Sequence, residues 1–187
     1  MPNITQFKSR LNGGVRPNLY EVEINFPTGV GGGGGTDDGK VSLSSQGRYL
    51  CRSTSLPTHS QGLIEVPFRG RFLKIPGDRT FEAWTATFYN TSDFNLRAAF
   101  ENWINIANQT DENIGVVGGL DSLFTDVTVR QLSKDSAGGK NSVLRTYRLV
   151  DAWPTSVGAI NVAFDSNDAL EEFDVEFQYQ YLSLIHI

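Results

Sequence analysis

The sequence contains a single cysteine, Cys51, and therefore has no internal disulfide framework. One thiol suits a reducing compartment, in which structural disulfides are rare. The N-terminal residues include no apolar segment of the kind found in signal peptides. No apolar run elsewhere reaches the length of a membrane span. These absences predict a soluble protein that is made in a cytoplasm and has no membrane anchor.

Metal-ligating residues are also scarce. The two histidines, His59 and His186, have no partner at the spacing that metal sites use. The segment that begins at Asp165 starts like a calcium loop, but Ala169 supplies no ligand oxygen from its side chain and Leu170 replaces the required glycine. The sequence therefore predicts a turn at 165–168 and no metal site.

Basic residues are also relatively few: the sequence has 16 basic and 21 acidic residues, and its net charge is −5. A protein that grips nucleic acid needs a basic surface to neutralise phosphates, so this balance argues against that class. The hydrophobic content of 39% and the charged content of 20% are ordinary for a globular protein. A chain of 187 residues fits one domain, residues 1–187, with a sizeable core.

Glycine is abundant, and many of the 19 glycines lie in one tract, Gly29–Lys40. The tract meets the glycine spacing of a dinucleotide-binding loop and most of a phosphate-loop pattern. The phosphate loop fails at Val41, where a hydroxyl is needed to hold magnesium. Both patterns lack a following helix whose N-terminus could face a phosphate, and Asp37 and Asp38 would repel one. The tract predicts a flexible hairpin tip and no cofactor.

Catalytic patterns are equally thin. Cys51 lies within a strand pattern, which favours a buried apolar role over a nucleophile. Two carboxylate pairs, Glu21 with Glu23 and Asp174 with Glu176, each share a strand face and could in principle support acid–base chemistry. Without a companion signal, solvated strand faces are the better interpretation. The sequence predicts no enzyme.

Alternation of apolar and polar residues predicts a protein that is mainly β. The clearest patterns are Tyr20–Phe26 and Phe173–Tyr181, each with one apolar and one largely polar face. A loop is expected at 136–141, where Gly and Asn cluster. Short strands at this spacing favour an antiparallel sandwich or barrel. Weaker candidate strands are Arg48–Ser53, Leu63–Phe68, Phe72–Ile75, Thr125–Leu132, Ser142–Trp153 and Ala159–Asp165.

The segment Ile75–Tyr89 contains the strongest local signals. Pro76-Gly77-Asp78 predicts a turn, because proline presets φ and glycine accepts a positive φ. The alternation at 84–88 then predicts a half-buried strand. One amphipathic helix is expected at about 93–108, and it should cover an open face or end of the sheet. Ser92 or Asp93 is expected to cap it. Its apolar stripe consists of Leu96, Phe100, Trp103 and Ala107.

Several of these segments, taken in order, resemble the tail tube proteins of contractile-tailed, myovirus-type bacteriophages. The resemblance covers about residues 15–181, nearly the whole chain. The segments that carry it are Arg16–Tyr20, Leu56-Pro57, Ile75–Trp84, Val129–Gln131, Trp153–Gly158, Asp165–Asn167 and Phe173–Val175.

The resemblance implies a structural virion protein with a β-barrel or sandwich and one helix. Members of this family form hexameric rings that stack into a hollow tube. The tube surrounds a tape-measure protein, lies inside a contractile sheath, and joins baseplate and tail-terminator proteins. It conducts DNA into the host after assembly in the bacterial cytoplasm. The implied contact between rings involves about Leu56–Phe68, and Asp78 and Arg79 become candidates for a subunit or ring contact.

A tube that conducts DNA should not bind it, and a negative wall would repel a polyanion. The candidate residues for facing the lumen are acids on polar strand faces, namely Glu21, Glu23, Asp174 and Glu176.

Other functions stay open at this point. The subunit of a baseplate tube-initiator, a tail terminator or a type VI secretion tube would share the same architecture. A β-sandwich carbohydrate-binding module would need an exposed aromatic platform, for which Tyr89 and Tyr147 are the available residues.

Two segments depart from the family pattern. Residues 30–47 are interpreted as a Gly-rich hairpin insertion. The last six residues, 182–187, break the strand alternation and equal one reading frame of a widely used transposase sequencing adapter. We therefore expect these last residues to be an artefact of sequence assembly, and we assign no function to His186.

Overall fold

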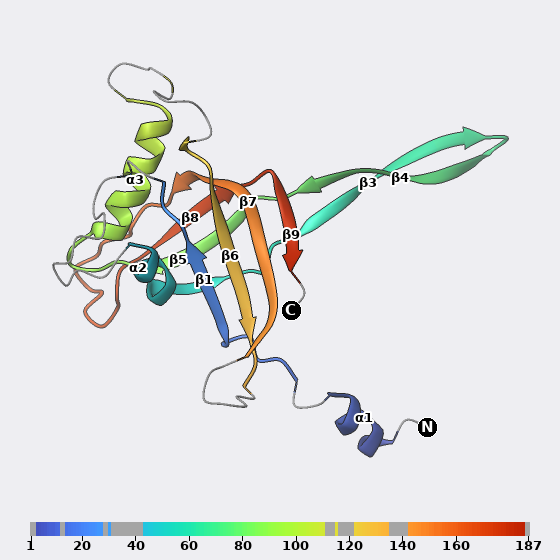
Figure 1. Ribbon diagram of the computed structural model, residues 1–187, viewed down its shortest axis with the longest axis horizontal. Coiled ribbons are helices and arrows are strands. Elements are labelled where there is room, and N and C mark those ends of the chain that lie inside the picture. The colour runs from blue at the N-terminus through green and yellow to red at the C-terminus, as the bar shows by residue number, and fades with distance from the viewer. Residues whose placement is uncertain are drawn as a thin grey trace.

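The computed structural model describes residues 3–11, 14–27, 30, 43–110, 115, 122–134 and 142–185. Antiparallel strands dominate the described part (Figure 1). The helices are α1 (Ile4–Leu11), α2 (Leu43–Leu50) and α3 (Asn95–Ala107). The strands are β1 (Tyr20–Ile24), β2 (Cys51–Thr54), β3 (His59–Phe68), β4 (Arg71–Phe81), β5 (Trp84–Tyr89), β6 (Thr125–Leu132), β7 (Val143–Val157), β8 (Glu172–Gln178) and β9 (Tyr181–Ile185).

One seven-stranded sheet folds over on itself and has the order β1-β6-β7-β8-β5-β2, with β9 also paired to β7. Strand β7 makes the fold possible, because its first part pairs with β6 and β9 and its end pairs with β8. Asp151 has a φ of 53° where β7 passes from one set of partners to the other. The two halves are called here the β6 half (β1, β6, the first part of β7, and β9) and the β8 half (β2, β5, β8 and the end of β7).

Alternation along each strand places the apolar side chains between the two halves. Val22 and Ile24 on β1, like Phe173 and Val175 on β8, are at most 2% exposed. This result confirms the apolar faces of the two clearest strand predictions. The strands are shorter than predicted, since β1 ends at Ile24 and β8 ends at Gln178, and Tyr181 already belongs to β9. The mainly β, antiparallel sandwich or barrel that the sequence predicts is therefore the observed fold class.

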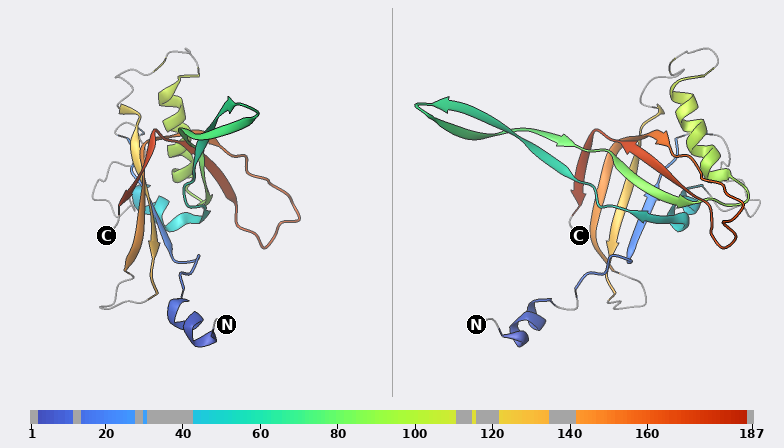
Figure 2. Two further views of the ribbon diagram at one scale, coloured as in Figure 1. Left: turned by 90° about the vertical axis from the view of Figure 1, so that its right-hand side faces the viewer. Right: turned by 180° about the vertical axis from the view of Figure 1, so that it is seen from behind.

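Helix α3 closes one end of the space between the halves (Figures 1 and 2). The buried Phe100 ring lies 5.3 Å from Phe26, 5.5 Å from Phe88 and 5.8 Å from Phe177, measured between ring centroids. The indole N–H of buried Trp103 donates to the Leu123 carbonyl at 2.9 Å, so this polar group is satisfied. The helix and its covering role match the prediction.

The helix start differs from the prediction. No side chain caps α3; Phe94 precedes it with a φ of 52°, and its backbone N–H donates to the Thr91 carbonyl at 2.9 Å. The expected cap by Ser92 or Asp93 is therefore wrong. A backbone turn takes its place.

Strands β1 and β2 approach each other at the open side of the folded sheet. The Tyr20 hydroxyl donates to the Arg52 carbonyl at 2.5 Å and lies 3.0 Å from the Cys51 carbonyl oxygen. Helix α2 lies against β1, where Gly47 approaches the Ile24 side chain. Together these contacts nearly close the sheet into a barrel.

Strands β3 and β4 form a separate two-stranded hairpin, called here the arm, which extends far from the body (Figure 2). Its turn lies at Arg69 and Gly70, with φ values of 45° and 80°. The turn predicted at Pro76–Asp78 is wrong, because these residues continue β4. Gly77 lies opposite Gly62, and the register shifts between Gln61 and Leu63. The proline and glycine thus mark a bulge and a close backbone approach.

The weaker strand predictions have mixed outcomes. Leu63–Phe68, Phe72–Ile75 and Thr125–Leu132 are strands, and Ser142–Trp153 coincides with most of β7. Ala159–Asp165 is not a strand, because β7 ends at Val157 and no described strand is available to pair with it. Arg48–Ser53 is half wrong, since its first three residues end α2. The turn at 165–168 is confirmed.

Some predictions fall on residues outside the described ranges. These are most of the Gly-rich segment (31–42), the loop at 136–141, and His186. Residues 181–185 form β9 on β7, which leaves the proposed origin of 182–187 a prediction. The structure also contains two short helices that the sequence did not predict, α1 and α2.

Candidate assembly surfaces

The arm exposes apolar side chains without burying them. Every residue of β3 is exposed, and in β4 only Gly77 and Phe81 are partly buried. The large apolar residues exposed on the arm, between 40% and 67% of each, are Leu63, Ile64, Val66, Phe68, Phe72, Leu73 and Ile75. Contiguous exposed apolar surface of this kind usually marks a site of association. The sequence predicts strands within both halves of the arm, but it does not predict that both faces of these strands stay exposed.

Few contacts tie the arm to the body. The Phe81 ring, at its base, lies 5.9 Å from the Tyr179 ring. Asp78 and Arg79 are both exposed, on β4 rather than in a loop, and Arg79 is paired with Gln61. The two candidate contact residues therefore lie on the arm, close to its base.

The candidate lumen residues Glu21 and Glu23 lie together on the outer face of the β6 half. The Arg130 guanidinium contacts both carboxylates, at 3.7 Å from Glu21 and 2.5 Å from Glu23. Glu21 also pairs with Arg48. Register explains the first contact, because Arg130 is the cross-strand partner of Glu21. The negative charge of this pair is therefore largely neutralised by neighbouring arginines.

The other candidate pair, Asp174 and Glu176, lies on the outer face of the β8 half. Asp174 accepts a hydrogen bond from the Thr87 hydroxyl at 2.7 Å, and Glu176 accepts one from the Ser156 hydroxyl at 3.4 Å. Neither carboxylate forms an ion pair with a basic residue of the described ranges. The structure thus separates the four acids into a neutralised pair and an unneutralised pair.

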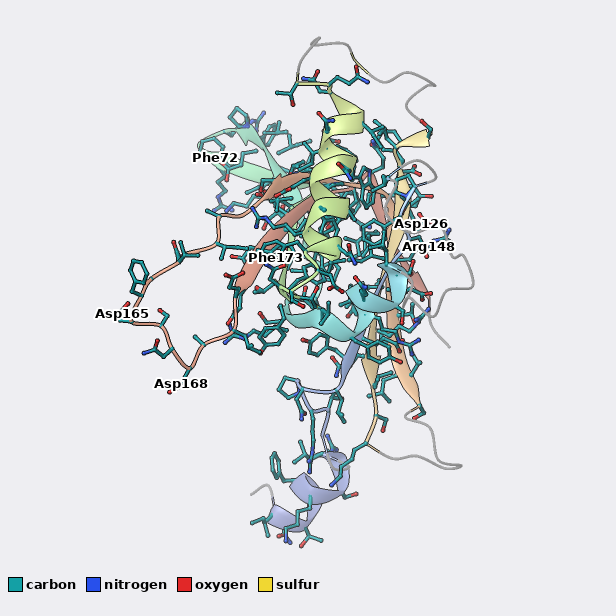
Figure 3. The ribbon with its side chains drawn as sticks, turned by 90° about the vertical axis from the view of Figure 1, so that its left-hand side faces the viewer. Phe72, Asp126, Arg148, Asp165, Asp168 and Phe173 are labelled. Carbon is teal, nitrogen blue, oxygen red and sulfur yellow. The ribbon has the colours of Figure 1, made fainter. Side chains whose placement is uncertain are left out.

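Asp126, an acid that no sequence pattern singled out, lies beside the bend of β7. Asp126 accepts from the Arg148 guanidinium, with 2.9 Å to Nε, and lies 3.4 Å from the Asp151 backbone nitrogen (Figure 3). The hydrogen bond from Arg148 to Asp126 raises the pKa of Arg148. Asp126 therefore links Arg148, which precedes the bend, to the backbone of Asp151 at the bend itself.

Cys51 and Tyr20 are held in their protonated forms. Burial raises the pKa of the Cys51 thiol to about 12. Burial and the nearby thiol likewise raise the pKa of the Tyr20 hydroxyl to about 12. A thiolate is the nucleophilic form of cysteine, so the local structure agrees with the apolar role that the sequence predicted for Cys51.

The described residues contain no group of three or more His, Cys, Asp or Glu side chains placed to hold a metal ion. Within the same ranges, no helix is long and apolar enough to cross a membrane. Of the two tyrosines considered for a carbohydrate platform, Tyr147 packs against the core and Tyr89 is partly buried.

The chain thus combines a folded-over β-sheet, an exposed apolar arm and polar outer faces. These features place it in the class of β-structured subunits that associate through projecting elements. The sequence model described as "Phage tail tube protein" matches residues 15–184. The chain is 30% identical over 168 residues to the tail tube protein gp19 of Enterobacteria phage T4, covering 89% of this chain and 90% of that protein.

Two solved structures are similar in fold. A sheath/tube terminator of an extracellular contractile injection system aligns with a TM-score of 0.60 and 17% identity, over 91% of this chain and 96% of that one. An Hcp protein aligns with a TM-score of 0.50 and 14% identity, over 89% and 91%. At these identities the likeness concerns the fold alone.

The chain belongs to the phage tail tube protein family. The resemblance drawn from the ordered sequence segments is therefore confirmed, and the protein is a structural component of the phage tail.

Proposed function

We propose that this chain is the major subunit of the inner tube of a contractile tail. Copies close into hexameric rings, and the rings stack into a hollow tube that surrounds a tape-measure protein. A sheath packs around the tube, and baseplate and terminator proteins occupy its ends. DNA passes through the tube without being bound, and the protein needs neither catalysis nor a cofactor.

The observation that carries this proposal is the arm. A two-stranded ribbon that buries neither face is marginal in water by itself. Its exposed apolar side chains, among them Phe68, Phe72 and Leu73, gain burial only against another surface. Stacked copies of the same chain supply that surface at every arm. Asp78 and Arg79, near the arm base, are proposed to contribute polar contacts at the same junction.

The outer face of the β8 half is proposed to line the lumen. Asp174 and Glu176 leave negative charge on that face, between short threonine and serine side chains. Like charge keeps DNA off such a wall. The pair on β1 is the weaker candidate, because Arg130 and Arg48 offset its charge.

Electron microscopy of the purified full chain over a range of concentrations tests whether the chain assembles into a tube. Stacked six-fold rings support the proposal. Single rings that never stack would instead indicate a terminator or initiator, and a monomer at high concentration would contradict assembly altogether.

Reversing the charge of the two acidic pairs tests which face of the subunit lines the lumen. Phage particles that carry Asp174→Lys with Glu176→Lys should eject DNA more slowly than particles with the matched change, Glu21→Lys with Glu23→Lys. Equal ejection rates for the two double variants, or a slower rate for the β1 variant, would remove the β8 half from the lumen.

A further inference from the structure

Helix α1 is an amphipathic helix without a partner in its own chain. Ile4, Phe7 and Leu11 form one stripe and are 69%, 63% and 52% exposed, and no residue of the helix is buried. Figures 1 and 2 show α1 standing away from the body at the end of its connection to β1. An eight-residue helix is marginal in water by itself. Its stability therefore calls for a docking surface.

The charges on α1 restrict what that surface can be. Lys8 and Arg10 lie on either side of the apolar stripe, and the helix contains no acidic residue. A matching surface must be apolar at its centre and negative at its edges. The arm does not qualify, because its basic residues, Arg69, Arg71, Lys74 and Arg79, outnumber its acids, Glu65 and Asp78.

The segment between β7 and β8, residues 158–171, offers both apolar and negative groups and is called here the acidic loop. It contains no basic residue and three acids, Asp165, Asp168 and Glu171. It also exposes Val162, Phe164 and Leu170, at 79%, 107% and 72%. Figure 3 shows Asp165 and Asp168 on the part of the loop that projects from the body.

The acidic loop and α1 extend from different sides of the same molecule and do not touch (Figures 1 and 2). Each is therefore open to a second copy of the chain. We propose that α1 of one subunit docks onto the acidic loop of a neighbouring subunit. The apolar stripe packs against Phe164 and its neighbours, while Lys8 and Arg10 pair with Asp165 and Asp168. This contact rests on the proposed function in one respect, since assembly is what brings two copies of the chain together.

Disulfide cross-linking between two differently tagged chains tests the contact. Both chains carry Cys51→Ala; one adds Phe7→Cys and the other Phe164→Cys. Mixing them under oxidising conditions should give a heterodimeric cross-link. Its yield should fall about tenfold with Lys8→Glu and Arg10→Glu, because two ion pairs become repulsive. Asp165→Lys with Asp168→Lys in the partner should restore it. The matched control, Arg16→Glu with Lys134→Glu, should leave the yield unchanged.

Three results would overturn the proposal. The first is the absence of a cross-link in the mixture. The second is an efficient cross-link within one dilute chain that carries both cysteines, which would mean that α1 folds back on its own loop. The third is preferential cross-linking of position 164 to Phe72→Cys, which would assign the loop to the arm. Electron microscopy of the unmodified chain reports separately on the tube, so stacked rings without the cross-link would refute this contact alone.

Discussion

Replacing Phe72 with alanine should weaken assembly while leaving the subunit fold intact. Phe72 lies on the arm and is 63% exposed. A phenylalanine carries roughly 200 Å² of surface, so about 120 Å² remains to be buried in a contact. At about 25 cal/mol per Å², burial of that area stabilises the contact by about 3 kcal/mol, and alanine would retain about a third of it. The expected loss of about 2 kcal/mol per contact corresponds to a roughly 30-fold change in the association constant.

The matched control is the same substitution in the core. Phe100 is fully buried among the rings of Phe26, Phe88 and Phe177. Phe100→Ala should lower the free energy of unfolding by about 3–5 kcal/mol, because it removes apolar contacts and leaves a cavity. Phe72→Ala should change that free energy by less than about 0.5 kcal/mol, as exposed substitutions usually do.

Sedimentation measures the concentration above which rings or tubes form, and denaturant titration at low concentration measures the stability of the subunit. Phe72→Ala should raise the threshold concentration roughly 30-fold with an unchanged unfolding midpoint. A threshold within about threefold of the unmodified chain would show that Phe72 is not buried on assembly. A similar loss of stability in both variants would refute the division into arm and core.

Three further predictions concern single sites. Gly77→Val should weaken tube formation without shifting the unfolding midpoint of the subunit. A Cβ at this position would lie 3.1 Å from the carbonyl carbon of Gly62, so the two strands of the arm must move apart; unchanged tube formation would contradict this prediction. The Cys51 thiol should react with an aromatic disulfide far more slowly in the native protein than in guanidinium at about pH 8. Since burial raises its pKa from 9.0 to about 12, folding stability should fall as pH rises through that window, and Cys51→Ala should flatten the fall. Asp126→Asn should cost less than about 1 kcal/mol of stability, because the pair with Arg148 is partly exposed; a loss above about 2 kcal/mol would mean that the bend of β7 depends on the charge.

The sequence predicts best those elements whose burial follows a single period. Strand β8 alternates Phe173, Val175 and Phe177 with polar residues, and its apolar face is the buried one. Helix α3 likewise buries Leu96 and Phe100 at the expected spacing. In both cases one face meets the core and the other meets solvent, so the local pattern carries the information.

The arm could not be predicted in the same way, because neither of its faces is buried within the subunit. An apolar pattern without a polar face does not distinguish a strand that is buried within the subunit from a strand that is buried only when another chain binds. The apparent turn at Pro76–Asp78 failed for a related reason. Its glycine is required by the backbone of Gly62, which lies 15 positions earlier and comes close only in the folded hairpin. Local turn propensity contains no information about such a pairing.

The carboxylate pairs illustrate the same limit at the candidate site. Glu21 with Glu23 and Asp174 with Glu176 follow the same alternation, and along the chain they are equivalent. Strand register separates them, because Arg130 is the partner of Glu21 whereas Thr87 is the partner of Asp174. Cross-strand neighbours set the charge that a face presents to its surroundings. The choice of a lumen face therefore follows from which strands pair, and the unneutralised acids direct it to the β8 half.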